Sequence, residues 1–117
     1  EVTHINAHAT STPVGDIAEY KALEAVFGER VREIPVSATK ASHGHLLGGT
    51  GALEAIFAIL AVKERTAPPT INLEELDPEI PLSVSTSPQQ LGDAPQLAIS
   101  NSFGFGGHNA VVAVRSV

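Results

Sequence analysis

Apolar and polar residues alternate along this chain in two ways, which predict short strands and two long helices. Strand-like runs occupy 2–7, 34–38, 81–85, 97–102 and 110–114. Apolar residues at helical spacing mark 17–27, where Asp16 is expected to cap the helix and Gly28 to end it. The charged residues of this helix are assigned to its outer faces: Glu19, Lys21 and Glu24.

The second helix is expected over 46–62, after a loop at 40–44, and Pro68 and Pro69 stop any continuation. The segment 45–62 is nearly free of charge, but Glu54 and three glycines favour a buried helix over a membrane span. This helix is apolar on all sides, and the run 110–114 has no polar face. Both need cover on every side, so a second half or a second subunit is expected to supply it.

Composition narrows the class of protein. The chain has 117 residues, of which 43% are hydrophobic and 17% charged, as in one small globular domain. A net charge of −6 makes nucleic acid an unfavourable partner. The first residues read like a strand already under way, without signal-peptide or transit-peptide character. We therefore expect a segment of a soluble protein, from the cytoplasm or from an organelle stroma or matrix.

The chain contains no cysteine, which excludes disulfides, thiolate zinc sites and a cysteine nucleophile within these residues. Five histidines are present, and the pairs His4/His8 and His43/His45 are closely spaced. Without thiolates or a zinc-binding helix motif, this spacing is weak support for a metal, and no metal site is expected.

His8 and His45 stand out by their context. His8 ends a strand before a hydroxyl-rich turn, and His45 is expected at the start of the long helix. A ring at the positive end of a helix dipole tends to stay neutral and can donate a hydrogen bond to an anion. Lys40 precedes this helix and Glu54 lies within it, so a buried ion pair between the two is expected.

The turn Gly104-Phe105-Gly106-Gly107 lies between two strand-like runs. Glycines there allow positive φ angles and a close approach of the backbone to a ligand. Backbone N–H groups in such a turn can form an oxyanion site, and a plain tight hairpin is the simpler alternative.

Three motifs in order carry a resemblance. They are NAHATSTP from Asn6, TKASHGHLLG from Thr39 and NSFGFGGHN from Asn101. Together they resemble the C-terminal half of the β-ketoacyl-acyl-carrier-protein synthases, the elongating condensing enzymes of the thiolase fold. The resemblance extends over the whole chain and includes the Pro-Pro-Thr-Ile-Asn-Leu stretch between motifs.

The resemblance implies roles for particular residues. His8 and His45 match the two catalytic histidines, and Lys40 matches a lysine that supports the second. Glu54 matches the acidic partner of that lysine. Thr10 and Thr12 match contacts to the phosphopantetheine arm. Phe105 matches a gating phenylalanine whose backbone N–H completes the oxyanion hole.

The resemblance also implies a fold and a reaction. The fold is α/β: residues 1–117 form the C-terminal half of a thiolase-like unit, a mixed sheet packed on the 46–62 helix. The complete protein is αβαβα and usually a homodimer, and its N-terminal half carries the nucleophilic cysteine. The implied enzyme is an acyltransferase that condenses an acyl thioester with malonyl-acyl-carrier protein in fatty-acid elongation.

This reaction needs no cofactor beyond the phosphopantetheine of the acyl-carrier protein, and this chain alone is expected to be inactive. Two alternatives stay open, a polyketide-type ketosynthase and a non-catalytic partner subunit. Ala9, His43 and His108 depart from the residues common in the family, and His43 adds a titratable group near the site.

Overall fold

The computed structural model describes residues 1–117 and shows a mixed five-stranded sheet in the order β4-β2-β1-β6-β7. β4, β2, β1 and β6 run parallel to one another, and β7 is antiparallel to β6. The strands are β1 (His4–Asn6), β2 (Pro35–Ser37), β4 (Ser83–Val84), β6 (Leu97–Gly104) and β7 (His108–Arg115). A separate antiparallel pair joins β3 (Thr66–Ala67) to β5 (Gln89–Gln90). The expected α/β fold with a mixed sheet is confirmed.

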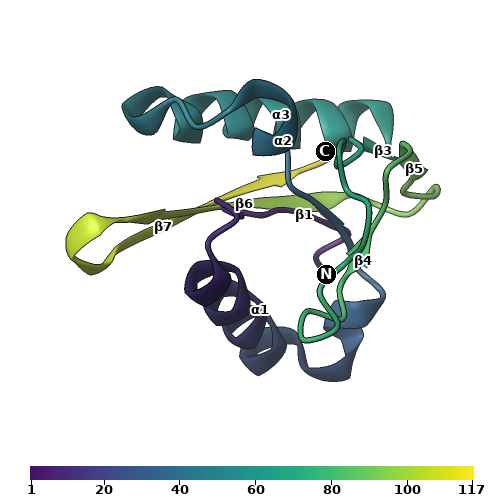
Figure 1. The fold of residues 1–117 in the computed structure, drawn as a ribbon. Helices are drawn as coiled ribbons and strands as arrows, with labels where there is room; N and C mark the ends of the chain where they lie inside the picture. Colours follow the sequence, from purple (N-terminus) through teal and green to yellow (C-terminus); the bar gives the residue numbers. More distant parts are fainter.

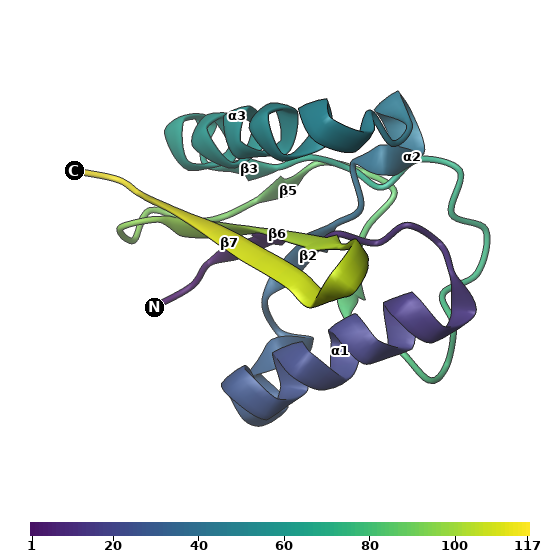
Figure 2. The same ribbon diagram turned by 90° about the vertical axis from the view of Figure 1, so that its left-hand side faces the viewer.

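The sheet is the middle of three layers, with a long helix on each face (Figure 1). Helix α1 (Pro13–Phe27) covers one face, and α3 (Thr50–Glu64) with the single turn α2 (Lys40–His43) covers the other. Figure 2 shows the same layers from the side of the β6–β7 hairpin. Short 3-10 turns complete the chain at Gly28–Arg32, Leu47–Gly49 and Phe105–Gly107.

Strand alternation gives the two faces of the sheet different chemistry. On the α1 face, Ile5 joins an apolar cluster whose buried members are Ile5, Ala7, Tyr20, Leu23, Val31, Ile34 and Val36. The apolar cluster on the α3 face is smaller and consists of Ala58, Val62 and Ala98. His4 and Asn6 of β1 are fully buried polar residues. The polar part of the interior therefore lies towards α2 and α3.

The first helix begins earlier than the sequence pattern predicted. Pro13 is its first residue and Thr12 its N-cap, so Asp16 is not the cap but lies in the first turn. Proline suits this position because its missing N–H would have no helical partner there. Asp16 instead accepts a hydrogen bond from the backbone N–H of Ser11 at 3.2 Å. Gly28 caps the C-terminal end, as expected.

The assignment of faces on α1 was wrong in part. Glu19 is buried, with 5% exposure, together with Tyr20 and Leu23, whereas Val26 is 76% exposed. The carboxylate turns inwards because backbone N–H groups of the loop after β1 need an acceptor there.

The second helix starts at Thr50 rather than at residue 46, because 47–49 form a 3-10 turn. It ends at Glu64 with Arg65 in the left-handed conformation, before Pro68 and Pro69 are reached. The segment expected to be a loop at 40–44 contains the helical turn α2.

Within this chain, α3 is buried along one side only. Its buried residues form one stripe of mostly small or polar side chains: Thr50, Glu54, Ala58, Ala61 and Val62. The opposite face leaves Ile56, Ile59 and Leu60 between 43% and 52% exposed. On β7, Val111 and Val112 are also exposed. None of the helices has the length and apolar character needed to cross a membrane.

His4 is completely buried, and its Nε2 lies 3.0 Å from Ser37 Oγ. The Ser37 hydroxyl donates to the carbonyl oxygen of Pro68, so the neutral ring donates its Nε2–H to Ser37. Nδ1 is buried without a partner. Burial lowers the pKa of the His4 imidazole from 6.5 to about 4.

We predict that His4 makes stability fall in mild acid. His4 takes up a proton near pH 6.5 in the unfolded chain but only near pH 4 in the folded protein. Below pH 6.5 protonation therefore favours the unfolded state, so the stability that the neutral buried ring provides is fully present above pH 6.5 and is lost as the pH falls. Between pH 7.5 and 5 this single group lowers the free energy of unfolding by about 2 kcal/mol. Denaturant titrations of wild type and His4→Gln measure the difference. Equal pH slopes for the two proteins contradict the assignment, and His108→Gln, at an exposed histidine, is the control with an unchanged slope.

Candidate active site

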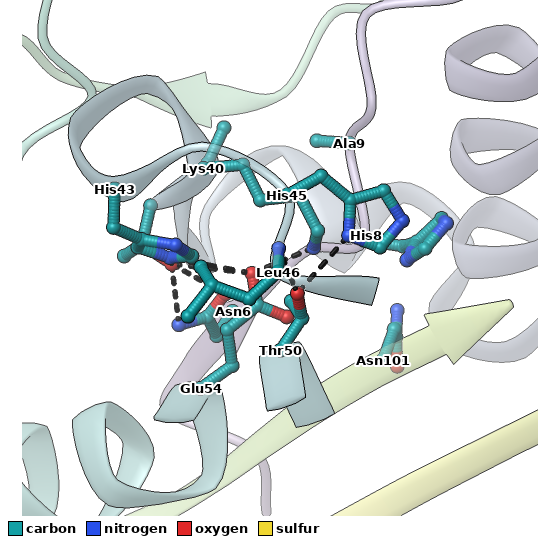
Figure 3. A network of polar contacts seen from close by, with 12 residues as sticks. Asn6, His8, Ala9, Lys40, His43, His45, Leu46, Thr50, Glu54 and Asn101 are labelled. Atoms are coloured by element: carbon teal, nitrogen blue, oxygen red, sulfur yellow. Dashed lines mark hydrogen bonds and ion pairs between the residues drawn. The ribbon is translucent and has the colours of Figure 1, made fainter. Parts of the chain in front are cut away.

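Two histidines meet at the edge of the sheet where the parallel strands end. His8 follows β1, and His45 follows α2, which itself follows β2. Their ring centroids lie 5.7 Å apart with the planes at 88°, so one ring points its edge at the other (Figure 3). Phe103 of β6 lies 5.4 Å from the His8 ring. In α/β proteins this edge is where ligands bind, because the loops after neighbouring strands converge there.

The hydrogen bonds around His45 fix its tautomer. Thr50 has one hydroxyl proton, and its Oγ1 accepts the backbone N–H of Leu46 at 2.7 Å. The hydroxyl therefore donates to His45 Nδ1, 3.0 Å away, and the backbone N–H of Leu47 also points at Nδ1. Nδ1 is thus an acceptor, and the neutral ring carries its proton on Nε2. His45 lies before α3 rather than within it, but Thr50 ties its ring to the first residue of the helix.

The environment of His8 also favours a neutral ring. Burial, followed by the positive charge of Lys40, lowers the pKa of its imidazole below 6.5. His45 acts in the same direction, and the carboxylates of Glu19 and Glu54 oppose it. Each ring can offer an N–H donor to a developing anion, as an oxyanion site requires.

Glu19 holds the backbone that carries His8. Its Oε1 accepts the N–H of His8 at 2.8 Å, and its Oε2 accepts the N–H of Ala9 at 2.9 Å. Asn101 Nδ2, from β6, donates to Oε1 at 3.0 Å. One buried carboxylate on α1 thus connects the loop after β1 to the neighbouring strand.

Lys40 and Glu54 form the expected ion pair. Lys40 Nζ lies 2.6 Å from Glu54 Oε1, and the two side chains are 6% and 0% exposed. Figure 3 shows the pair behind the two histidines, with Lys40 on α2 and Glu54 on α3. The pair braces the two helices on either side of the loop that carries His45.

Asn6 and Thr39 connect this pair to the sheet. Asn6 Nδ2 donates to Thr39 Oγ1 at 3.2 Å, and Thr39 Oγ1 lies 3.4 Å from Glu54 Oε1. Both residues are buried: Asn6 is the last residue of β1, and Thr39 follows the neighbouring strand β2. The ends of these strands are therefore linked through side chains as well as through the backbone ladder.

Backbone strain accompanies both histidines. Ala9 and Ser11 follow His8 with φ angles of 37° and 62°, and Leu47 follows His45 with φ of 50°. Such angles are unfavourable for residues other than glycine and persist where surrounding contacts enforce them. Glu19 supplies such a contact at Ala9, and His45 Nδ1 supplies one at Leu47.

A cavity of about 520 Å³ opens beside His45. Lys40, Glu19 and Thr10 contribute to its polar part, and its walls are mainly apolar residues of β2 and the 70–84 segment. His8 does not line it, so the cavity adjoins one face of His45 rather than the space between the two rings.

The structure brings His8, His45, Lys40 and Glu54 together but leaves the other expected residues apart. Phe105 is 98% exposed at the tip of the β6–β7 hairpin, and the ring against His8 is that of Phe103. Thr10 lines the cavity, and Thr12 caps α1 without a side-chain capping bond. No group of three or more histidine or acidic side chains is arranged to hold a metal ion.

Sequence reasoning missed the residues that support these groups: Asn6, Glu19, Thr39, Thr50 and Asn101. A Ser or Thr five residues after a motif histidine is too common to attract notice, and Glu19 looked like an ordinary surface position on a helix. Asn6, Thr39 and Asn101 each begin a quoted motif, and this was the one signal that could have marked them.

Comparison with known proteins agrees with this geometry. Residues 1–74 match the family model described as beta-ketoacyl synthase, C-terminal domain. Over 115 residues the chain is 48% identical to 3-oxoacyl-[acyl-carrier-protein] synthase 2 of Staphylococcus aureus (strain COL). That alignment covers 98% of this chain and 28% of the relative, so the chain spans just over a quarter of that protein's length.

Solved structures resemble the chain over nearly its whole length. The ishigamide ketosynthase/chain length factor superposes with a TM-score of 0.91 at 35% identity, covering 100% of this chain and 28% of that one. A ketosynthase in complex with its type II PKS acyl-carrier protein gives a TM-score of 0.90 at 31% identity, covering 99% and 28%. The fold is that of a thiolase-like ketosynthase domain. The chain belongs to the β-ketoacyl synthase family and matches its C-terminal domain.

The ion pair yields a prediction about stability. Lys40→Met leaves Glu54 charged and buried without its partner, so it should lower the free energy of unfolding by about 3–5 kcal/mol. Replacing both residues, as Lys40→Met with Glu54→Leu, removes the unpaired charge and should cost less than Lys40→Met alone. Denaturant unfolding of the single and double variants measures this coupling. Simple addition of the two single effects contradicts a direct pair.

Glu19 yields a second prediction. Glu19→Gln replaces one acceptor oxygen with an N–H₂ group that faces the backbone or amide donors now bound. We expect a loss of about 1.5–3 kcal/mol in unfolding free energy, because the lost bonds involve a charged group. The amide protons of His8 and Ala9 should exchange faster in hydrogen-exchange measurements. Unchanged exchange at both residues contradicts the role, and Glu29→Gln, at an exposed residue, serves as the control.

Proposed function

We propose that the protein containing this chain is a β-ketoacyl-acyl-carrier-protein synthase that catalyses decarboxylative condensation in fatty-acid elongation. The observation that carries the proposal is the pair of histidines with ring centroids 5.7 Å apart, in which His45 Nδ1 is engaged by Thr50 and its Nε2–H is left to donate. A malonyl thioester that loses CO₂ becomes an enolate with its negative charge on the thioester oxygen. Two imidazole donors stabilise that charge more than they stabilise the neutral substrate, and this difference lowers the barrier.

The chemistry proceeds in two bond changes. The bond between the malonyl methylene carbon and its carboxylate breaks, CO₂ leaves, and the electron pair remains as the enolate held by His8 and His45. The enolate carbon then attacks the carbonyl of an acyl group carried on cysteine, and the cysteine thiolate leaves. This chain has no cysteine, so the nucleophile comes from residues outside these 117.

Other residues take supporting roles in this proposal. Lys40, paired with Glu54, keeps positive charge beside His8 and lowers the pKa of its imidazole. Thr10 and Thr12 offer hydroxyls to the amides of the phosphopantetheine arm. Phe105 acts as a gate over the acyl-cysteine, and its backbone N–H contributes to the oxyanion hole. The reaction draws on no cofactor other than the phosphopantetheine that carries the substrate.

The proposed domain arrangement follows from the uncovered apolar surfaces. Residues 1–117 act as the C-terminal half of a five-layer αβαβα enzyme, whose N-terminal half packs on the open face of α3 around Ile56, Ile59 and Leu60. The complete enzyme is a homodimer and receives its substrates from acyl-carrier protein. A solved relative described as a complex of an acyl-carrier protein with its ketosynthase supports the last point.

A polyketide-type ketosynthase or a non-catalytic partner subunit is the second candidate. It is favoured by the similarity, at 35% identity, to a structure described as a ketosynthase/chain length factor. The 48% identity to a 3-oxoacyl-[acyl-carrier-protein] synthase 2 weighs for fatty-acid elongation. The presence together of His8, His45 and Lys40 weighs against a non-catalytic subunit.

The histidines provide the test of the proposed reaction. In the complete enzyme, His8→Ala and His45→Ala should each slow malonyl decarboxylation by about 10²–10³-fold, because each removes one oxyanion donor. Acylation of the cysteine should persist in both. Release of CO₂ from malonyl-acyl-carrier protein and mass spectrometry of the acylated enzyme measure the two steps separately. The 117-residue chain alone is the blank, and near-normal decarboxylation by either variant refutes its assigned donor.

A further inference from the structure

His43 occupies a position that the proposed reaction does not use. It is the last residue of α2, four residues after Thr39, and its side chain is 14% exposed. Its ring packs on Phe57 of α3 with the centroids 5.6 Å apart. In Figure 3 the ring lies on the far side of Glu54 from the two catalytic histidines.

The tautomer of His43 follows from the groups around Nε2. This nitrogen lies 3.3 Å from Thr39 Oγ1 and 3.8 Å from Glu54 Oε1. A lone pair on Nε2 would face the carboxylate and be repelled by it, whereas an N–H there is attracted. The single hydroxyl proton of Thr39 also has better acceptors in Glu54 and in Asn6 Oδ1. The neutral ring therefore carries its proton on Nε2 and directs it between Thr39 and Glu54.

The polar groups around the Glu54 carboxylate all approach the same oxygen, Oε1. Oε1 is approached by Lys40 Nζ at 2.6 Å, by Thr39 Oγ1 at 3.4 Å and by His43 Nε2 at 3.8 Å. Oε2 is buried and has no partner. Donors on one side therefore fix the orientation of the carboxylate. That orientation in turn determines where the Lys40 ammonium group lies. The charged groups facing His43 are Glu54 from α3 and Lys40 from its own helix.

Packing alone does not explain a histidine at this position. Nδ1 of His43 is buried without a partner, and leaving a buried polar atom unpaired destabilises the folded state. A leucine would fill the space against Phe57 without that cost. The feature that leucine lacks is the N–H directed at Glu54.

We propose that His43 is a positioning residue for catalysis: its Nε2–H, shared between Thr39 and Glu54, fixes the carboxylate that holds Lys40 beside the catalytic histidines. The inference rests on the proposed function only in its predicted effect of His43 on the rate of malonyl decarboxylation. The contact itself and the tautomer are properties of the folded protein.

Two replacements of His43 in the complete enzyme separate its donor from its packing. His43→Phe keeps a ring against Phe57 but removes the N–H, whereas His43→Gln keeps an N–H donor of similar reach. His43→Phe should lower kcat for malonyl decarboxylation about tenfold with KM nearly unchanged, because it removes the Nε2–H that bonds to Thr39 and lies 3.8 Å from Glu54 Oε1. His43→Gln should recover most of that loss. Val31→Ala, buried in the other apolar cluster, should lower stability but not kcat.

A double-variant experiment tests whether His43 acts through Lys40. In a Lys40→Met background, His43→Phe should cause no further fall in kcat, because the group it positions is gone. The proposal is overturned if His43→Phe has wild-type kcat, or if His43→Gln is as impaired as His43→Phe. It is also overturned if His43→Phe lowers kcat by the same factor in the Lys40→Met background as in the wild-type enzyme.

A spectroscopic measurement keeps this inference apart from the proposed function. Long-range ¹H–¹⁵N correlation spectra of wild-type enzyme report which ring nitrogen of His43 carries the proton. Protonated Nε2 supports the positioning contact, and protonated Nδ1 overturns it. Absence of malonyl decarboxylation by wild-type enzyme would refute the proposed function and leave the spectroscopic result to decide the contact.

Discussion

The buried pair of Lys40 and Glu54 is the constraint around which this domain is arranged. Removing two charges from water is costly, and the cost is tolerated only where partners are close and held in place. Here α2 supplies the cation and α3 the anion, so the two elements cannot separate without exposing a charge to an apolar interior. The chain between them carries His45, and its path is therefore fixed at both ends.

The helix α3 performs two tasks with residues one turn apart. Thr50 holds the ring of His45, and Glu54 holds Lys40, and both lie on the buried stripe of the helix. Residues four apart share a helix face, so one orientation of α3 satisfies both contacts. The small residue Ala58 continues this stripe and lets the helix approach the sheet closely. Catalytic geometry and packing thus depend on the same few side chains.

The opposite face of the sheet, covered by α1, contributes through one buried polar side chain, that of Glu19. Glu19 of α1 lies on the side of the sheet that holds the larger apolar cluster. Its carboxylate accepts hydrogen bonds from two backbone N–H groups and from Asn101, and no cation is among its partners. The two histidines are consequently supported from different layers, His8 by α1 and His45 by α3. Any change in the spacing of these layers alters the distance between the rings.

Much of this arrangement could be predicted from the sequence. The pattern of apolar residues located the five strands of the main sheet and both long helices but not the short pair β3 and β5. A lone glutamate in an apolar helix indicated its lysine partner. The rest depended on tertiary contacts that leave no local signal. Helical spacing could not show that Glu19 turns inwards, since only the loop after β1 creates the need for its carboxylate. Nor could it show that the long helix begins at Thr50, because 47–49 are apolar and glycine-rich like the helix itself.

The β6–β7 hairpin extends beyond the rest of the sheet. β1 pairs with β6 only from Ala98 to Ser100, whereas the antiparallel ladder with β7 continues to Gly104. Phe105 therefore lies at the tip of a projecting hairpin whose other end is part of the sheet. Its side chain and its backbone N–H belong to the same residue of the hairpin tip, so bending the hairpin displaces both together. In the proposed reaction, where Phe105 is both the gate over the acyl-cysteine and an oxyanion donor, a bend of the hairpin would move the gate and the donor together.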